Sequence, residues 1–139
     1  MKTSILLAGL LLALPVAATA DAFEATPVAT PVNGSDWVID SADHVSGVNS
    51  AQQISNPAKI SYDSLMDDTS EMKELKKKGI KKDSARGQVL VSNAKDRVRR
   101  AAKAVMEAKG HCSVWKKIKS KSKVQVTDLT EAVRKRLND

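Results

Sequence analysis

The chain has 139 residues, and its 23 lysines and arginines against 16 acidic residues give a net charge of +7. The single cysteine, Cys112, excludes an internal disulfide, and an aromatic content of 3% leaves little material for a large core. A chain this small and without disulfide bonds needs another source of stability, and we expect it to associate with further copies of itself.

The first twenty residues have the organisation of a secretory signal peptide. A lysine near the start precedes an apolar run from Ile5 to Leu14, Pro15 breaks the run, and residues 18–20 read Ala-Thr-Ala, an A-x-A cleavage signal. The apolar run is too short to cross a bilayer. The pattern predicts a signal peptide over 1–20 and an exported chain that is soluble after cleavage near Ala20.

Residues 21–57 are acidic and poor in bulky apolar side chains. They contain five carboxylates and no lysine or arginine, and proline, glycine and small polar residues are frequent. Because such a composition buries too little apolar surface to offset chain entropy, it predicts a disordered acidic leader. The stretch "DWVID" at 36–40 predicts either a transient apolar patch or a short strand or docking anchor around Trp37.

Residues 58–139 hold 22 lysines and arginines against 11 acidic residues, and we expect them to form the folded body. The alternating "AKISY" at 58–62 predicts a short strand. Asp68 and Glu71 have the D-x-x-E spacing of a helix start, which predicts a first helix that ends at Gly79.

A second, longer helix is predicted from Asp83 or Ser84 to a C-cap at Gly110. Gly87, near its start, predicts either a tolerated glycine or a flexible tip. The apolar positions recur with the period of one helix face, and the alanines among them suggest close approach of a partner helix. These positions are Leu90, Ala94, Val98, Ala101, Ala102, Val105 and Met106. Cations occupy much of the remaining surface, namely Arg86, Lys95, Arg97, Arg99, Arg100, Lys103 and Lys109.

Two strands, at 111–118 and 123–126, are predicted to form a hairpin around a turn at 119–122. Asp128 and Glu131 repeat the D-x-x-E start and predict a final helix. Its apolar stripe consists of Leu129, Val133 and Leu137. The order strand, helix, helix, strand, strand, helix predicts an α+β fold, in which a small β-sheet body carries a short antiparallel helical hairpin and a C-terminal helix.

Three stretches within 58–139 resemble the OmpH/Skp family of periplasmic chaperones. They are "AKISYDSLMDDTSEMKELKKKG", "AKDRVRRAAKAVMEAKGHCSVWKKI" and "VQVTDLTEAVRKRL". Tyr62 corresponds to the aromatic residue near the end of the family's opening strand, residues 110–114 to its returning strand, and the closing helix is the most specific match. The resemblance implies a body over 58–139 that joins three subunits. The family's long helical arms enclose an unfolded client, and here the connection "KKKGIKKDSARGQ" makes the arm much shorter.

The resemblance implies an ATP-independent holdase-type chaperone that binds unfolded outer-membrane or exported proteins. The residues expected to face a partner helix or the client are Leu90, Val98, Val105 and Met106. Those expected to supply an attractive positive field are Arg97, Arg99, Arg100 and Lys103. Two alternatives stay open for the cations: a non-enzymatic oligomeric envelope adaptor that binds anionic surfaces such as lipopolysaccharide or lipid headgroups, or simply a solvated helix face.

Other function classes lack their characteristic residues. No G-x-S-x-G, no His–carboxylate pair with a nucleophile and no glycine-rich phosphate loop is present, so we expect neither an enzyme nor a cofactor. His44 and His111 are the only histidines, which is too few for a metal site. With Tyr62 and Trp115 as the only aromatic residues of the body, nucleic acid is not expected as a partner. Cys112 is expected to be a buried strand residue, with an intermolecular disulfide as the alternative.

Overall fold

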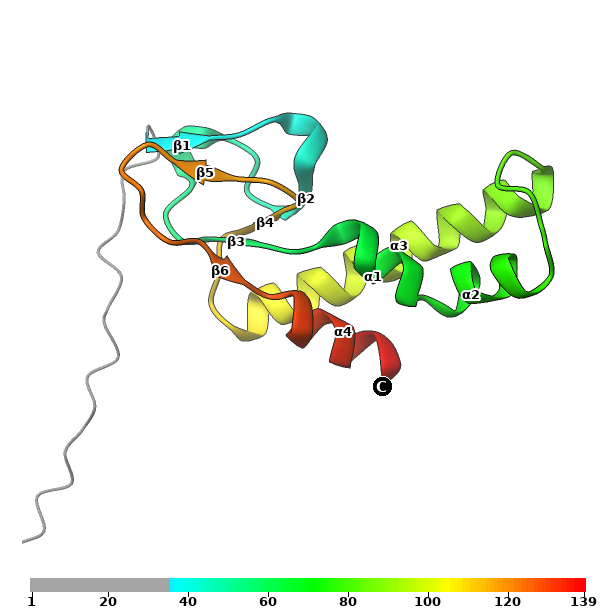
Figure 1. The fold of residues 1–139 in the computed structure, drawn as a ribbon. Helices are drawn as coiled ribbons and strands as arrows, with labels where there is room; N and C mark the ends of the chain where they lie inside the picture. The colour runs from blue at the N-terminus through cyan, green and yellow to red at the C-terminus, as the bar shows by residue number, and fades with distance from the viewer. Residues whose placement is uncertain (1–35) are drawn as a thin grey trace, which may run out of the picture.

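A computed structural model describes residues 36–139 of the chain. Figure 1 shows an elongated molecule in which short strands gather at one end and a helical hairpin projects at the other. The strands are β1 (Trp37–Val38), β2 (His44–Gly47), β3 (Pro57–Lys59), β4 (Ser113–Trp115), β5 (Lys119–Ser120) and β6 (Thr127–Asp128). The α-helices are α1 (Tyr62–Asp68), α2 (Ser70–Lys77), α3 (Ala85–Ala108) and α4 (Thr130–Asn138), with 3-10 turns η2 (Ser41–Asp43) and η3 (Ala51–Gln53). The predicted α+β class is confirmed.

The main sheet has the strand order β2-β4-β3-β6. Strand β3 runs parallel to both of its neighbours, with Ala58 opposite Val114 of β4 and Thr127 of β6. Strand β2 is antiparallel to β4, and a separate antiparallel ribbon joins β1 to β5. The opening strand of the predicted body therefore shares a ladder with the segment that returns after the long helix.

The predicted hairpin of 111–118 with 123–126 is wrong. Strand β4 pairs with β2 on one side and β3 on the other, so it has no free edge for the segment that follows it, and β5 pairs with β1 instead. Residues 123–126 form no strand. Continuing the parallel register of β6 would place Val126 beside Pro57, whose nitrogen carries no hydrogen to donate, so the ladder ends at Thr127.

Residues 36–57 are part of the folded unit, so the prediction of disorder is wrong for them. The Trp37 side chain is 5% exposed, and its Nε1 donates a hydrogen bond to the Ile54 carbonyl at 3.1 Å. Val45 on β2 is also buried. Residues 36–57 contain few bulky apolar side chains, but three of them, Trp37, Val45 and Ile54, are buried in the folded chain. Residues 21–35 and the predicted signal peptide lie outside the described residues.

The start of the helical region differs from the prediction because of Thr69. Its hydroxyl donates to the Met66 carbonyl at 2.7 Å and accepts from the Met72 amide at 3.3 Å, which ends α1 and caps α2. Tyr62, predicted to end the opening strand, and residues 63–67, which lie between that strand and the predicted helix start at Asp68, belong to α1. Asp68 is therefore the last residue of α1 and not the start of a capping box.

Helix α3 lies close to its predicted bounds. The Ser84 hydroxyl accepts from the Gly87 amide at 3.1 Å and caps its start. Gly110 follows its end with a φ of +70°, a conformation that glycine adopts without strain. A Cβ on Gly87 would lie 1.9 Å from the Lys81 carbonyl oxygen, so glycine lets the preceding loop cross tightly over the helix start. This packing favours a structural role for Gly87 over a flexible tip.

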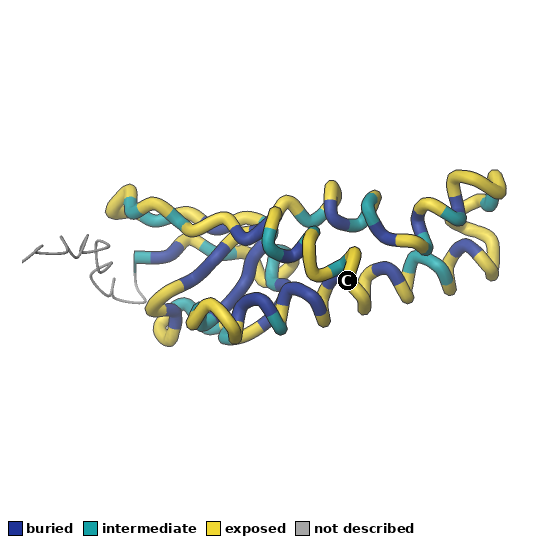
Figure 2. Tube along the Cα trace, turned by 90° about the horizontal axis from the view of Figure 1, so that it is seen from below, coloured by how far each residue is buried: buried dark blue, intermediate teal, exposed yellow. Residues whose placement is uncertain are grey.

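The core follows the predicted apolar face of α3. Figure 2 shows buried positions along one side of this helix and on the strands beside it. Val98, Ala102 and Val105 pack there with the main sheet, α1 and α4. A second cluster forms around Trp37 and Trp115 under the β1–β5 ribbon. A third cluster joins α2 to the first half of α3, and this antiparallel pair is the arm.

Candidate functional site

The four apolar residues expected to face a partner helix or client lie mainly inside the chain. Val98, Val105 and Met106 are 0%, 8% and 6% exposed and belong to the core. Leu90 is half-buried and packs in the cluster of the arm. The partner elements are the chain's own sheet and helices, which corrects the expectation that these residues contact a client in the folded protein.

The four predicted cations are exposed but do not form one cluster. Arg97 is held by Glu71, whose Oε1 accepts from the Arg97 Nε at 3.0 Å. The Lys103 ammonium lies 3.9 Å from Glu107. Arg99 lies on the side of Tyr62, where burial raises the tyrosine pKa and the charge of Arg99 opposes that rise. Only Arg97 and Arg100 line the same depression.

That depression, the arginine groove, is a cavity of about 390 Å³ between α3 and α4. Arg97 and Arg100 come from α3 and Arg136 from α4. Within residues 36–139, Arg100 and Arg136 form no ion pair. The remaining lining residues are Ala101, Ala104, Leu137 and Asp139. Arg136 was missed in the sequence because nothing in its local pattern shows that α4 packs against α3.

A second depression, the arm groove, lies where α1 and α2 meet α3 and has a volume of about 340 Å³. Its apolar lining comes from Tyr62, Met66, Met72 and Val91, and its charged lining from Asp63, Asp67, Lys82 and Lys95. Met66 and Val91 are half-buried, so part of each remains available for contact. Methionine is flexible and polarisable and adapts to irregular apolar partners. The arm groove therefore offers a small adaptable apolar strip between charges of both signs.

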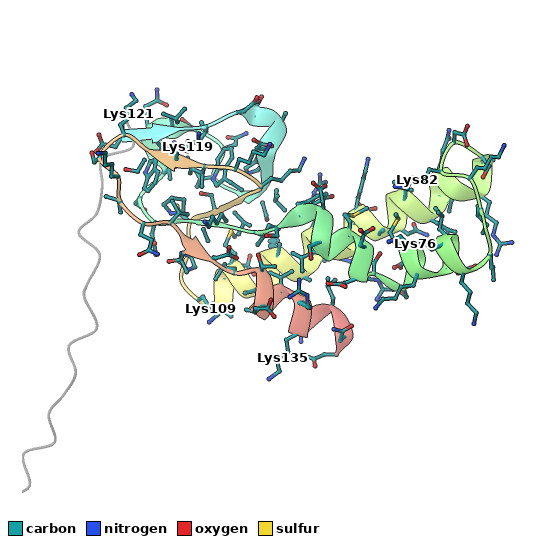
Figure 3. The ribbon with its side chains drawn as sticks, viewed as in Figure 1. Lys76, Lys82, Lys109, Lys119, Lys121 and Lys135 are labelled. Carbon is teal, nitrogen blue, oxygen red and sulfur yellow. The ribbon has the colours of Figure 1, made fainter. Side chains whose placement is uncertain are left out.

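Sequence reasoning missed the arm groove because α1 was not expected. Met66 fell between the predicted strand at 58–62 and the predicted helix start at Asp68, so the sequence did not place it on a helix face beside Met72. The signal that could have revealed it is Thr69, whose side chain can end one helix and begin the next. Figure 3 shows Lys82, which lines the arm groove, on the arm side of the molecule. Lys119 and Lys121 lie at the opposite end, where the short strands gather.

Cys112 and the histidines do not form a site with other ligating residues. The Cys112 thiol is half-buried just before β4, and the Asn56 amide donates to its sulfur at 3.3 Å. Burial favours the neutral thiol, but hydrogen bonds from Ser113, Asn56 and Ser55 outweigh it and lower the pKa of Cys112. Across residues 36–139, no three His, Cys, Asp or Glu side chains are close enough together to hold a metal ion.

Comparison with known proteins gave no match: no protein-family model fits the chain, and neither a curated protein nor a solved structure is significantly similar to it. Among residues 36–139, none of the helices combines the length and apolar composition that a membrane crossing requires.

Proposed function

We propose that the chain is a non-enzymatic, ATP-independent, holdase-type chaperone of the periplasm that binds unfolded outer-membrane or exported proteins in its arm groove. The observation that carries the proposal is the composition of this groove, where the half-buried Met66 and Val91 lie between lysines and aspartates. The signal-peptide pattern of residues 1–20 supports an exported protein. The resemblance to the OmpH/Skp family supports a client-binding role for the arm.

The chemistry of the groove suits an extended polypeptide segment. Such a segment presents apolar side chains together with unsatisfied charges, and the groove offers partners for both. Each square ångström of apolar surface that is covered contributes about 25 cal/mol, so one groove of this size binds weakly and releases its client without ATP. Several copies of the arm around one client would raise the overall affinity by multivalency.

The test compares two valines that are neighbours on α3. Val91 lines the arm groove, whereas Val89 is 58% exposed and lies outside it. We expect Val91→Asn to raise the protein concentration needed to suppress aggregation of a urea-unfolded outer-membrane β-barrel by about three- to fivefold. Val89→Asn should leave it unchanged. Circular dichroism checks that both variants are folded.

Two results would contradict the proposal. The first is that the unmodified protein fails to suppress aggregation at stoichiometric concentration. The second is that both valine variants suppress aggregation equally well.

The arginine groove favours a second candidate function, a non-enzymatic envelope adaptor that binds anionic surfaces such as lipopolysaccharide or lipid headgroups. The guanidinium group binds phosphate oxygens in a bidentate geometry, and Arg100 and Arg136 form no ion pair within residues 36–139. This binding should weaken with salt, because the Debye length is about 8 Å at physiological ionic strength.

Vesicle co-sedimentation distinguishes this candidate from the first. The double variant Arg100→Gln/Arg136→Gln removes two charges from the groove, and Lys109→Gln/Lys135→Gln removes two charges elsewhere. Figure 3 shows this second pair at the end of α3 and on α4. Stronger loss of binding to anionic vesicles by the arginine variant would support the adaptor. Equal loss of vesicle binding by both double variants would show that binding depends on net charge alone and not on the arginine groove.

A further inference from the structure

A third depression lies where the parallel strands of the main sheet end. Strands β3, β4 and β6 run in the same direction, so their carboxyl ends meet at one edge. Residues at the ends of these strands line a cleft of about 540 Å³, which we call the strand-end cleft. Ligands commonly bind outside the carboxyl ends of parallel strands, and the volume lies within the range of small-molecule sites, roughly 300–1,000 Å³.

Charges along this cleft follow the strand order. Asp43 precedes β2, Lys116 and Lys117 follow β4, Lys59 ends β3, and Asp128 ends β6. A third carboxylate, Asp63, lines the cleft from the first turn of α1, which follows β3. Because the order across the sheet is β2-β4-β3-β6, the lysines occupy the centre and an aspartate stands at each side. With Asp63 after the inner strand β3, the cleft presents three lysines and three aspartates, and so offers a ligand charges of both signs.

These opposite charges do not neutralise one another in ion pairs. Within residues 36–139, none of the cleft's lysine ammonium groups lies within 4.0 Å of one of its carboxylates. The Lys116 ammonium instead donates to the Ala42 carbonyl at 3.0 Å and stands 4.9 Å from the centre of the Tyr62 ring. Lys116 is thus engaged within the chain, whereas no ion pair within residues 36–139 holds Lys59 or Lys117.

Asp128 is held in place by its neighbour. Its Oδ1 accepts from the Thr130 amide at 2.9 Å and from the Thr130 hydroxyl at 2.5 Å. The Thr130 hydroxyl in turn accepts from the Ser61 amide at 2.8 Å. Groups held this way lose little conformational freedom when a ligand binds.

We propose that the strand-end cleft binds a small zwitterion of the amino-acid or dipeptide class. Its carboxylate would lie against the central lysines, its ammonium group against a flanking aspartate, and an apolar portion against Tyr62. A simple anion would meet the flanking carboxylates and a simple cation the lysines, so a ligand with both charges fits best. The site goes beyond the proposed chaperone function, because internal segments of an unfolded client carry no free termini.

The test is an NMR titration of the ¹⁵N-labelled protein with two dipeptides. Alanyl-alanine has both charged termini, whereas N-acetyl-alanyl-alanine methylamide has neither. We expect alanyl-alanine, added to about 20 mM because so small a ligand binds in the millimolar range, to shift the amide signals of Tyr62, Lys116 and Asp128 saturably. The blocked dipeptide should not shift them. An absence of saturable shifts, equal shifts with the blocked dipeptide, or equal shifts with acetate alone would overturn the proposal.

Variants then place the site. Lys59→Gln and Asp43→Asn should each weaken alanyl-alanine binding about fivefold, while Lys109→Gln and Asp83→Asn, which lie outside the cleft, should not. Folded cleft variants that bind as well as the unmodified protein would refute the assignment. Val91→Asn should retain dipeptide binding, and the cleft variants should still suppress aggregation, so failure of this proposal is distinguishable from failure of the chaperone proposal.

Discussion

Glu71 shows how one carboxylate joins two helices of the arm. It lies in the first turn of α2 with its side chain 14% exposed, and it accepts from the Nε of Arg97 on α3 at 3.0 Å and from the Nη2 at 2.8 Å. The Ser70 hydroxyl also donates to Glu71. Burial alone would raise the pKa of Glu71, but the hydrogen bonds with Arg97 and Ser70 outweigh it and lower the pKa. The carboxylate is therefore more stable as an anion in the folded chain than in the unfolded one.

We expect Glu71→Gln to lower the free energy of unfolding by about 1 kcal/mol at neutral pH, a modest value because the Arg97 side chain is 44% exposed. A lowered folded-state pKa stabilises the fold above the unfolded pKa of about 4.3, and this contribution is lost as pH falls through the folded-state pKa. Urea unfolding should therefore show a difference between the two proteins at neutral pH that shrinks under acid conditions.

The control for this prediction is Glu107→Gln. The Glu107 side chain is 61% exposed and lies 3.9 Å from Lys103, so its removal should change stability little at either pH. A constant difference between Glu71→Gln and the unmodified protein across the acid range would contradict the assigned role of the Glu71 carboxylate.

At the scale of elements, β1 and its neighbours anchor a stretch whose composition predicts disorder. Trp37 is 5% exposed in a cluster with Ile54 and Trp115, whereas the next residue, Val38, is 52% exposed. We expect Trp37→Ala to lower the free energy of unfolding by about 3–5 kcal/mol, because a large buried side chain leaves a cavity. Val38→Ala should change it by less than about 0.5 kcal/mol. Guanidinium unfolding followed by circular dichroism measures both changes. If Trp37→Ala lowered the free energy of unfolding as little as Val38→Ala, the result would contradict the finding that Trp37 anchors this stretch to the folded unit.

Long periodic elements could be predicted from the sequence, and short non-local ones could not. Helix α3 repeats its apolar face over 24 residues, and Ser84 and Gly110 mark its ends, so its bounds were predicted closely. The strands are only two to four residues long, and their partners lie far away in the chain. No local pattern shows that β4 pairs with β2 and β3 and leaves no edge for a hairpin.

The candidate sites were less predictable than the fold, for the same reason. Arg97 and Arg100 were identified as surface cations, but Arg136 joins them only because α4 packs on α3. The helical spacing of Val98 and Val105 is the same whether these residues face the protein's own core or a binding partner. Only the tertiary structure distinguishes these two roles, and it places both in the core.

At the scale of the whole molecule, charge and exposed apolar surface indicate how copies of the chain could meet. Residues 36–139 contain 22 lysines and arginines against 14 acidic residues, so identical copies repel one another over much of their surface. Val38 and Val89 are the large apolar residues of this part of the chain that are exposed. Strands β2 and β6 are the outer strands of the main sheet. Association would therefore use polar and strand-edge contacts more than an apolar face.

We expect light scattering to give the mass of a trimer, as the resemblance to the OmpH/Skp family implies, and higher salt to favour the assembly because it screens like charges. A dilution series measures whether the assembly dissociates. A mass equal to one chain at all concentrations would contradict the trimeric body and would remove multivalency from the proposed binding of clients.

The parallel pairing of β3 with β4 and β6 also constrains the order of folding. Ala58 pairs with Val114 of β4 and with Thr127 of β6. The ladder can therefore be completed only when almost the whole chain has been synthesised. Contacts of such long sequence separation form slowly, whereas the turns of α3 form from neighbouring residues. A nascent chain that stops before Thr127 would leave one side of β3 unpaired, and such an open edge is prone to aggregate with other chains.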